Sequence, residues 1–271
     1  MAVITICIYI AAPYALIAAP ARPTIHMPTA PVGPFVRFGA LPQAQPALAV
    51  AFSCPGGGNA GTWGGDGQAA STEFHTQKIS EFCAIQEGDV TITAASGATS
   101  TFVAGDCFLI PAGLTFSWNQ GSSEVKKYYV EANHPPLEEA PTEVIAFDRQ
   151  VEVEQKKWWG FCAGEENLAA GEAPHAGAHV FFTDPSGQAT AGIWTCTAPY
   201  TTVGVVPYPT EEFIYLLEGD ITISGPSFGS ATFKAGDAFF IPKGLPLTWS
   251  QSQNVRKCFV VFAPPVELPK L

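Results

Sequence analysis

Polar and apolar residues alternate in short β-branched segments, of which residues 89–93 (DVTIT) and 220–224 (DITIS) are the clearest. Such alternation is typical of a strand with one buried face. Residues 105–111 and 236–242 are apolar runs that begin at a Gly-Asp turn and end at a proline, which belongs at a strand end because it cannot donate to a ladder. We find no window with the 3.6-residue periodicity of a helix. The pattern predicts an all-β protein of many short strands, arranged as sandwiches or barrels.

The same pattern occurs twice along the chain. Residues 81–113 and 212–244 share their glutamate, turn glycines and proline at a constant offset of 131 (212 − 81). A repeated unit of this size is far longer than a solenoid repeat, so the sequence predicts the tandem duplication of a whole domain. The repeat extends to further positions, namely Trp63 and Trp194, Trp118 and Trp249, and, after a one-residue slip, residues 125–130 and 255–260.

The duplication divides the chain into four parts. We predict an apolar tail (1–27), a first barrel (28–136), a linker rich in Pro and Glu (137–148) and a second barrel (149–271). The tail has three interpretations: a targeting signal, a membrane anchor, or a false start with translation beginning at Met27. A signal peptide normally begins with a basic region, and the tail has no basic residue before Arg22. A membrane-spanning helix is disfavoured by Pro13 in the middle of the apolar stretch and by the marginal length of that stretch.

Composition narrows the classes of function. Apolar residues make up 47% of the chain and charged residues 14%, which is typical of a globular protein. The net charge of −11 without a basic stripe argues against a nucleic-acid partner. The seven cysteines form no C-x-x-C pair, so we expect buried free thiols in a reducing compartment and a cytoplasmic protein. We predict no membrane association, and the sequence leaves open whether the protein forms a homodimer.

The turn motifs resemble those of a known family. Glu81-x(6)-Gly88 with Gly105-x(5)-Pro111-x-Gly113, and the same spacing from Glu212 onward, are similar to the two motifs of the cupin superfamily. The tetrapeptide LEGD and the A-G-x-W segment are similar to sequences in one branch of this superfamily, the ureidoglycine aminohydrolase-like and ethanolamine-utilisation-type cupins. The resemblance implies two tandem double-stranded β-helix barrels of the jelly-roll type. If the protein is an enzyme, the resemblance implies a hydrolase that acts on C–N bonds.

The resemblance also implies where a metal would bind. In metal-binding cupins two His, one Glu and a third His coordinate a single divalent ion. An imidazole, an amide oxygen and a carboxylate are sensible ligands for Mn, Fe or Zn, so the first copy is the candidate metal site, and a Phe in the fourth place weakens it. The matching residues are His75, Gln77, Glu81 and Phe116 in the first copy, and Val206, Tyr208, Glu212 and Leu247 in the second.

The glutamate is the ligand position that both copies keep. A carboxylate inside a barrel is costly unless it is paired, so Glu81 and Glu212 are either functional groups or structural partners of repeated residues. Candidate partners, which are also candidate ligand-binding residues, are Lys127, Lys257, Trp118 and Trp249. We expect Tyr208 to face Glu212 and to form with it the preferred, metal-free catalytic or binding pair, with Trp249 as the apolar wall.

Three hypotheses about function follow. The first is a bicupin that binds a small polar metabolite, such as an amine, amide or ureido compound, without a cofactor. The second is a metal-dependent aminohydrolase-type enzyme that uses His75, Gln77 and Glu81 in the first barrel. The third is a structural or storage protein with inert barrels. The missing second-motif His in both copies favours the first hypothesis over the second.

Overall fold

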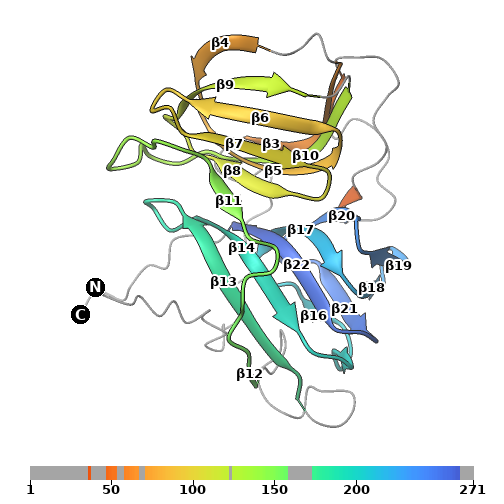
Figure 1. Ribbon diagram of the computed structural model, residues 1–271. Coiled ribbons are helices and arrows are strands. Elements are labelled where there is room, and N and C mark those ends of the chain that lie inside the picture. Colours follow the sequence, from red (N-terminus) through yellow and green to blue (C-terminus); the bar gives the residue numbers. More distant parts are fainter. Residues whose placement is uncertain are drawn as a thin grey trace, which may run out of the picture.

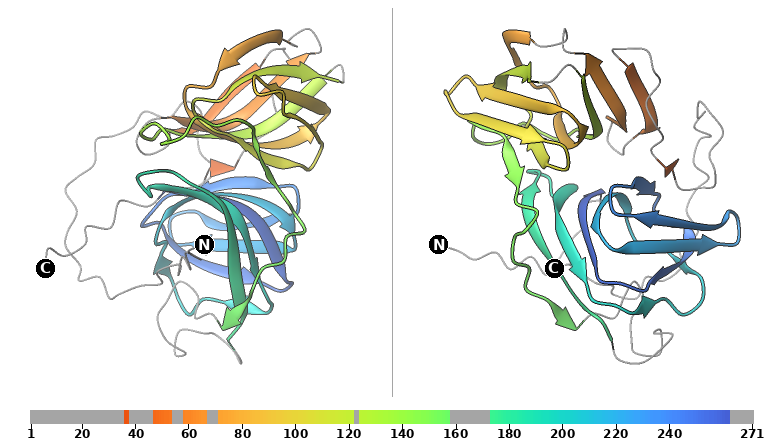
Figure 2. Two further views of the ribbon diagram at one scale, coloured as in Figure 1. Left: turned by 60° about the vertical axis from the view of Figure 1, so that its left-hand side comes forward. Right: turned by 45° about the vertical axis from the view of Figure 1, so that its right-hand side comes forward.

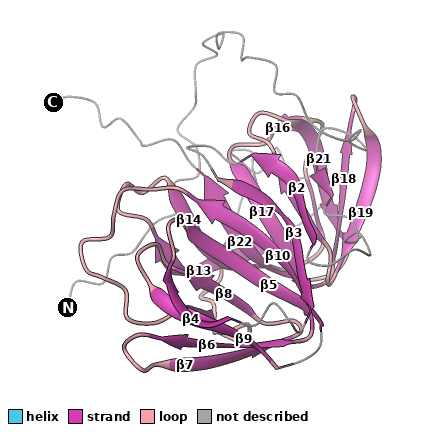
Figure 3. Ribbon diagram, turned by 90° about the horizontal axis from the view of Figure 1, so that it is seen from above, coloured by secondary structure: helices cyan, strands magenta, loops and turns pink. Residues whose placement is uncertain are grey.

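The computed structural model describes residues 36–37, 47–53, 58–66, 71–121, 124–157 and 173–262. These ranges contain strands, turns and loops but no helix (Figure 3). In particular, we find in them no helix that is long and apolar enough to cross a membrane. The strands form two barrels, one above the other (Figure 1), which confirms the predicted fold.

Each barrel consists of one large and one small antiparallel sheet. The large sheet of the first barrel has the order β11 (Ile145–Phe147), β8 (Cys107–Ile110), β5 (Ser80–Glu87), β10 (Glu124–Ala132), β3 (Asn59–Asp66) and β2 (Ala47–Ser53). Its small sheet has the order β4 (Ser71–Thr76), β9 (Thr115–Gln120), β6 (Asp89–Ala94) and β7 (Thr99–Val103).

The second barrel repeats this plan. Its large sheet has the order β1 (Val36–Arg37), β20 (Ala238–Ile241), β17 (Glu211–Glu218), β22 (Val255–Phe262), β14 (Ala189–Cys196), β13 (His175–Thr183) and β12 (Lys156–Lys157). Its small sheet has the order β15 (Tyr200–Thr201), β21 (Pro246–Gln251), β18 (Asp220–Gly225) and β19 (Gly229–Lys234), and β16 (Val206–Pro207) also pairs with β21.

Strand alternation places one set of side chains inside each barrel. In β6 the residues at every second position, Val90, Ile92 and Ala94, are buried and join the core of the first barrel. Because side chains two residues apart share a face, Glu81 and Cys83 of β5 point into the same interior. The residue between them, Phe82, faces the other barrel.

Each barrel receives a strand from the segment that precedes the other barrel. Strand β1 pairs with β20 of the second barrel, with Val36 opposite Phe240. Strand β11 lies in the segment that the sequence indicates as the linker, and it pairs with β8 of the first barrel, with Ile145 opposite Leu109. The two pairings are equivalent, since Phe240 and Leu109 are 131 residues apart. In Figure 2 the chain runs from β11 down along the second barrel.

The two large sheets share an apolar core between the barrels. One continuous cluster of buried side chains contains residues of both barrels. At its centre the rings of Phe82 and Phe213, which occupy equivalent repeat positions, lie 5.6 Å apart. Tyr128 and Tyr215 make a second ring contact across the same interface, at 6.0 Å. The duplicated domains therefore bury their outward faces against each other.

Candidate ligand-binding site

A buried ion pair occupies the same place in both barrels. In the second barrel Lys257 on β22 donates to Glu212 on β17, with 2.7 Å between Nζ and Oε1. In the first barrel Lys127 on β10 donates to Glu81 on β5. The structural alternative in the sequence analysis, a Glu–Lys pair repeated in each copy, is therefore present. A buried carboxylate and ammonium that neutralise each other avoid most of the cost of an isolated buried charge.

Two indole rings flank each lysine. The Lys127 ammonium lies 4.7 Å from the ring centre of Trp118 and 5.2 Å from that of Trp63. The two rings meet edge to face at 5.8 Å. In the second barrel Lys257 lies 4.8 Å from Trp194 and 5.2 Å from Trp249. The ring faces attract the cations, so each barrel has a closed unit of one acid, one lysine and two tryptophans.

The second barrel brings Tyr208, Glu212 and Trp249 together, as the sequence predicts. The hydroxyl of Tyr208 donates to Glu212, and only 1% of Tyr208 and 6% of Glu212 is exposed. Burial, and then the adjacent Glu212, raise the pKa of Tyr208 well above its usual value, so the phenol remains a donor at neutral pH. The fully buried Trp249 and Tyr208 belong to the apolar core of this barrel.

Gln251 completes the hydrogen-bond network inside the second barrel. The indole N–H of Trp249 donates to the side-chain oxygen of Gln251 at 3.1 Å. The amide nitrogen of Gln251 donates to the carbonyl oxygens of Cys196 and Thr197, each at 3.3 Å. The polar side-chain atoms around Glu212 are thus bonded to one another or to the backbone. This arrangement resembles a structural network more than an open binding site.

The first barrel surrounds its glutamate with more polar neighbours. Glu81 accepts from the thiol of Cys83 at 3.2 Å and from the amide of Gln77 at 3.4 Å. Burial raises the pKa of Glu81, but the ammonium of Lys127 and these hydrogen bonds outweigh burial and hold the pKa below its usual value. Burial is the main cause that raises the pKa of Cys83 well above its usual value. At neutral pH the site therefore holds a carboxylate and a thiol.

Two side chains of the first barrel have buried polar atoms without hydrogen-bond partners. They are Trp118 and Gln120 on β9, which are 9% and 7% exposed. The indole nitrogen of Trp118 and both polar atoms of the Gln120 amide have no hydrogen-bond partner among the described residues. Their repeat equivalents, Trp249 and Gln251, bond to each other. The same pair of residues is therefore satisfied in one barrel and unsatisfied in the other.

The two barrels also differ at a glycine next to the Gln120 amide. Gly65 of β3 occupies the position that Cys196 occupies in the second barrel, 131 residues later. A Cβ atom on Gly65 would lie 2.5 Å from Cη2 of Trp63 and 2.8 Å from the amide nitrogen of Gln120. The absence of a side chain on Gly65 allows the ring of Trp63 and the amide of Gln120 to lie over the β3 backbone. Gly65, Gln120 and Cys83 were not predicted as site residues, although the difference between Gly65 and Cys196 at equivalent repeat positions was a signal.

The candidate metal residues of the first barrel do not converge. His75 is exposed, and its ring packs on Phe116 with 4.2 Å between ring centres. Gln77 does approach Glu81, but the carboxylate of Glu81 already holds the ammonium of Lys127. Among the described residues no group of three or more His, Cys, Asp or Glu could hold a metal ion. The residues present do not fit a resident divalent ion, because a cation at Glu81 would meet the charge of Lys127.

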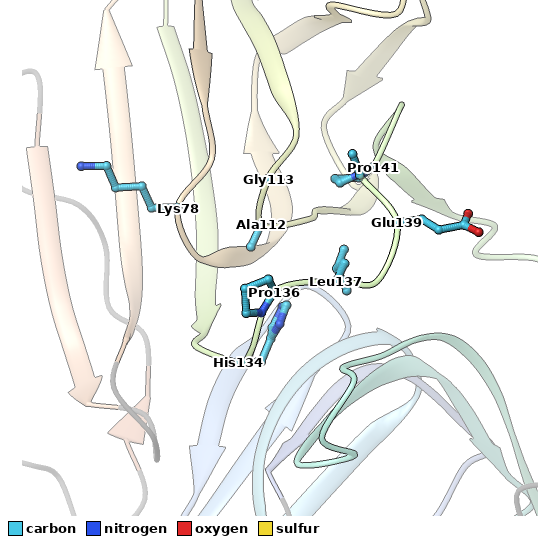
Figure 4. A pocket seen from close by; sticks show the side chains of 9 residues that line it. Lys78, Ala112, Gly113, His134, Pro136, Leu137, Glu139 and Pro141 are labelled. Carbon is cyan, nitrogen blue, oxygen red and sulfur yellow. The ribbon is translucent and has the colours of Figure 1, made fainter.

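A separate surface pocket lies outside the barrel interiors, between the rim of the first barrel and the segment after β10 (Figure 4). Its volume is about 370 Å³. Behind it, Ser80 accepts from the backbone N–H of Ala112 at 2.9 Å and bonds to His134 Nε2 at 2.7 Å. No residue predicted as a site lines this pocket, whose walls are Lys78, Ala112, Gly113, His134, Pro136, Leu137, Glu139, Ala140 and Pro141.

Comparison with solved structures supports the architecture. A protein of unknown function from Pseudomonas syringae pv. tomato superposes with a TM-score of 0.66 at 18% identity, covering 84% of this chain and 99% of the other. Protein Ylba from E. coli superposes with a TM-score of 0.54 at 14% identity, covering 88% of this chain and 94% of the other. AerE from Microcystis aeruginosa superposes with a TM-score of 0.51 at 10% identity, covering 85% of this chain and 99% of the other. At these identities the likeness shows the fold alone.

Sequence comparison identifies the family. No curated protein matches the chain significantly. The sequence model of the EutQ-like cupin domain matches twice, at residues 55–129 and 183–259, which together make up more than half of the chain. Each match lies within one barrel and contains the Glu–Lys pair of that barrel. The chain therefore belongs to the cupin superfamily, as a two-barrel protein with a EutQ-like cupin domain in each barrel.

Proposed function

We propose that this bicupin binds a small polar metabolite inside its first barrel and does so without a resident metal. The observation that carries the proposal is the pair of unpartnered side chains, Trp118 and Gln120, in that barrel. A buried polar group without a partner costs about 1–3 kcal/mol, and native proteins keep few such groups. A ligand that bonds to them regains that free energy on binding.

Differences between the barrels favour the first one as the binding barrel. Beside the glutamate the first barrel has an amide and a thiol where the second has a phenol and a branched alkyl chain. The first barrel is also more accessible, since 15% of the Glu81 side chain is exposed compared with 7% for Glu212. Binding sites combine apolar walls with a few polar groups that fix orientation. The two pairs of equivalent residues are Gln77 and Tyr208, and Cys83 and Ile214.

The second barrel then serves as the structural partner of the first. Glu212 and Tyr208, the preferred catalytic pair of the sequence analysis, are enclosed by their own partners. Their burial and complete hydrogen bonding favour a role in stability over contact with a metabolite. In the first barrel, Glu81 and Lys127 position the indoles of Trp63 and Trp118 around the proposed site.

Titration with a panel of polar metabolites tests the proposal. Thermal melts of the wild-type protein should shift upward with a bound compound, because a ligand that binds only the folded state stabilises it by RT ln(1 + [L]/Kd). We expect Gln120→Leu to weaken binding by about tenfold to a hundredfold, the value of one or two hydrogen bonds.

The matched control is Gln251→Leu, which changes the equivalent residue of the second barrel. We expect this variant to bind the same compound with wild-type affinity at a temperature below its own melting point. Loss of binding in Gln251→Leu with full binding in Gln120→Leu would place the site in the second barrel and contradict the proposal. A panel in which no compound binds would contradict it as well.

A further inference from the structure

We propose that the group recognised in the first barrel is a neutral carboxamide, held by Gln120 and Trp118. The inference rests on the proposed function and narrows it from polar metabolites to a single chemical class. It also assigns the recognising residues to β9.

The unpartnered atoms define the hydrogen bonds that a ligand must make. The Gln120 side chain has one acceptor oxygen and an NH₂ donor, and Trp118 has one N–H donor. None of these atoms has a hydrogen-bond partner within the part of the chain that the structure describes. A carboxamide has a carbonyl oxygen and an N–H on one planar group, so it can donate to the oxygen of Gln120 while its own oxygen accepts from Gln120 or Trp118. An amine has no such acceptor, and a carboxylate has no such donor.

The charges around the site argue against an ionic ligand. The ammonium of Lys127 lies 4.7 Å from the ring centre of Trp118, and Glu81 neutralises it directly. A cationic ligand would compete with Lys127 for the same indole faces. An anionic ligand would have to compete with Glu81 for the ammonium. Because burial of an uncompensated charge costs far more than burial of a hydrogen-bonded amide, a neutral group fits this lining best.

Trp63 forms the side of the site next to Gln120. Its ring occupies the space over Gly65, where a Cβ would approach both Trp63 and the Gln120 amide nitrogen within 3 Å. The side chain of Trp63 is only half-buried, whereas its equivalent Trp194 is 8% exposed. A side chain at Gly65 would press on both groups at once. Gly65→Ala therefore obstructs the proposed contact without removing any polar atom.

Three probes of the same shape test the inference: isobutyramide, isobutyrate and isobutylamine. Binding to the full-length protein is measured by saturation-transfer NMR at neutral pH, where the three probes are neutral, anionic and cationic. We expect isobutyramide to bind at least tenfold more tightly than either ionic probe. We also expect Gln120→Leu and Gly65→Ala each to reduce its binding at least tenfold, and Gln251→Leu to leave it unchanged.

The outcomes separate this inference from the proposed function. If isobutyrate or isobutylamine binds as tightly as isobutyramide and Gln120→Leu abolishes that binding, the first barrel is the site but the amide assignment is wrong. If isobutyramide binds equally to wild type and to Gln120→Leu, the assignment to Gln120 is wrong. If none of the three probes binds while another metabolite depends on Gln120, the amide class alone is wrong. Failure of every compound contradicts both proposals.

Discussion

Replacing Lys257 by methionine is expected to lower the free energy of unfolding by about 3–5 kcal/mol. The substitution removes the ammonium that donates to Glu212 at 2.7 Å, and it leaves the carboxylate buried with a hydrogen bond from the Tyr208 hydroxyl but without a neutralising charge. Breaking one half of a buried ion pair has this cost because an uncompensated charge remains in the interior. Urea unfolding at neutral pH, followed by circular dichroism, measures the change.

The double variant Lys257→Met, Glu212→Leu provides the control. Replacement of both charges by apolar groups of similar size removes the uncompensated charge, so we expect most of the lost stability to return. The same substitution in the first barrel, Lys127→Met, should cost less, because Glu81 is more exposed and also accepts from Gln77 and Cys83. A loss below about 1 kcal/mol for Lys257→Met would show that the second-barrel pair is not structural.

Replacing Phe213 by alanine is expected to cost about 3–5 kcal/mol, the usual range for a fully buried phenylalanine. Its side chain is completely buried, and its ring lies 5.6 Å from that of Phe82 at the interface between the barrels. The buried cluster around it contains residues of both barrels. We therefore expect the variant to melt at a lower temperature in one transition that includes both barrels. Differential scanning calorimetry measures both features.

An exposed phenylalanine provides the comparison for this variant. Phe74 is 52% exposed, so Phe74→Ala should change the melting temperature little. Two separate transitions in Phe213→Ala, with only one shifted, would show that the barrels unfold independently. That result would contradict a shared core that couples them.

Most of the fold could be predicted from the repeat. The alternation in residues 89–93 and 220–224 corresponds to β6 and β18, and the proline-terminated runs correspond to β8 and β20. The exchange of β1 and β11 between barrels could not be predicted. Each of these segments is two or three residues long, and its pairing depends on which barrel edge lies nearby, which local sequence does not specify.

The site could be predicted only in part. The resemblance to the cupin motifs correctly placed Tyr208 beside Glu212, although Tyr208 lies between β16 and β17 and not on the strand of Glu212. The difference between Gln120 and Gln251 could not be predicted, since both copies have the same residue at the same offset. Whether an amide finds a partner depends on tertiary neighbours: the Gln251 amide reaches the backbone carbonyls of Cys196 and Thr197, whereas the Gln120 amide has no such partner among the described residues.

The measurement that tests the account most directly compares the stabilities of Gln120→Leu and Gln251→Leu in the absence of ligand. Gln251 accepts from Trp249 and donates to backbone carbonyls, so its loss leaves buried groups unpaired and should cost about 1–3 kcal/mol. Gln120 has no partner to lose, so Gln120→Leu should leave the free energy of unfolding unchanged or raise it. Equal losses in both variants would show that Gln120 is a structural residue like its counterpart, and would contradict a ligand site in the first barrel.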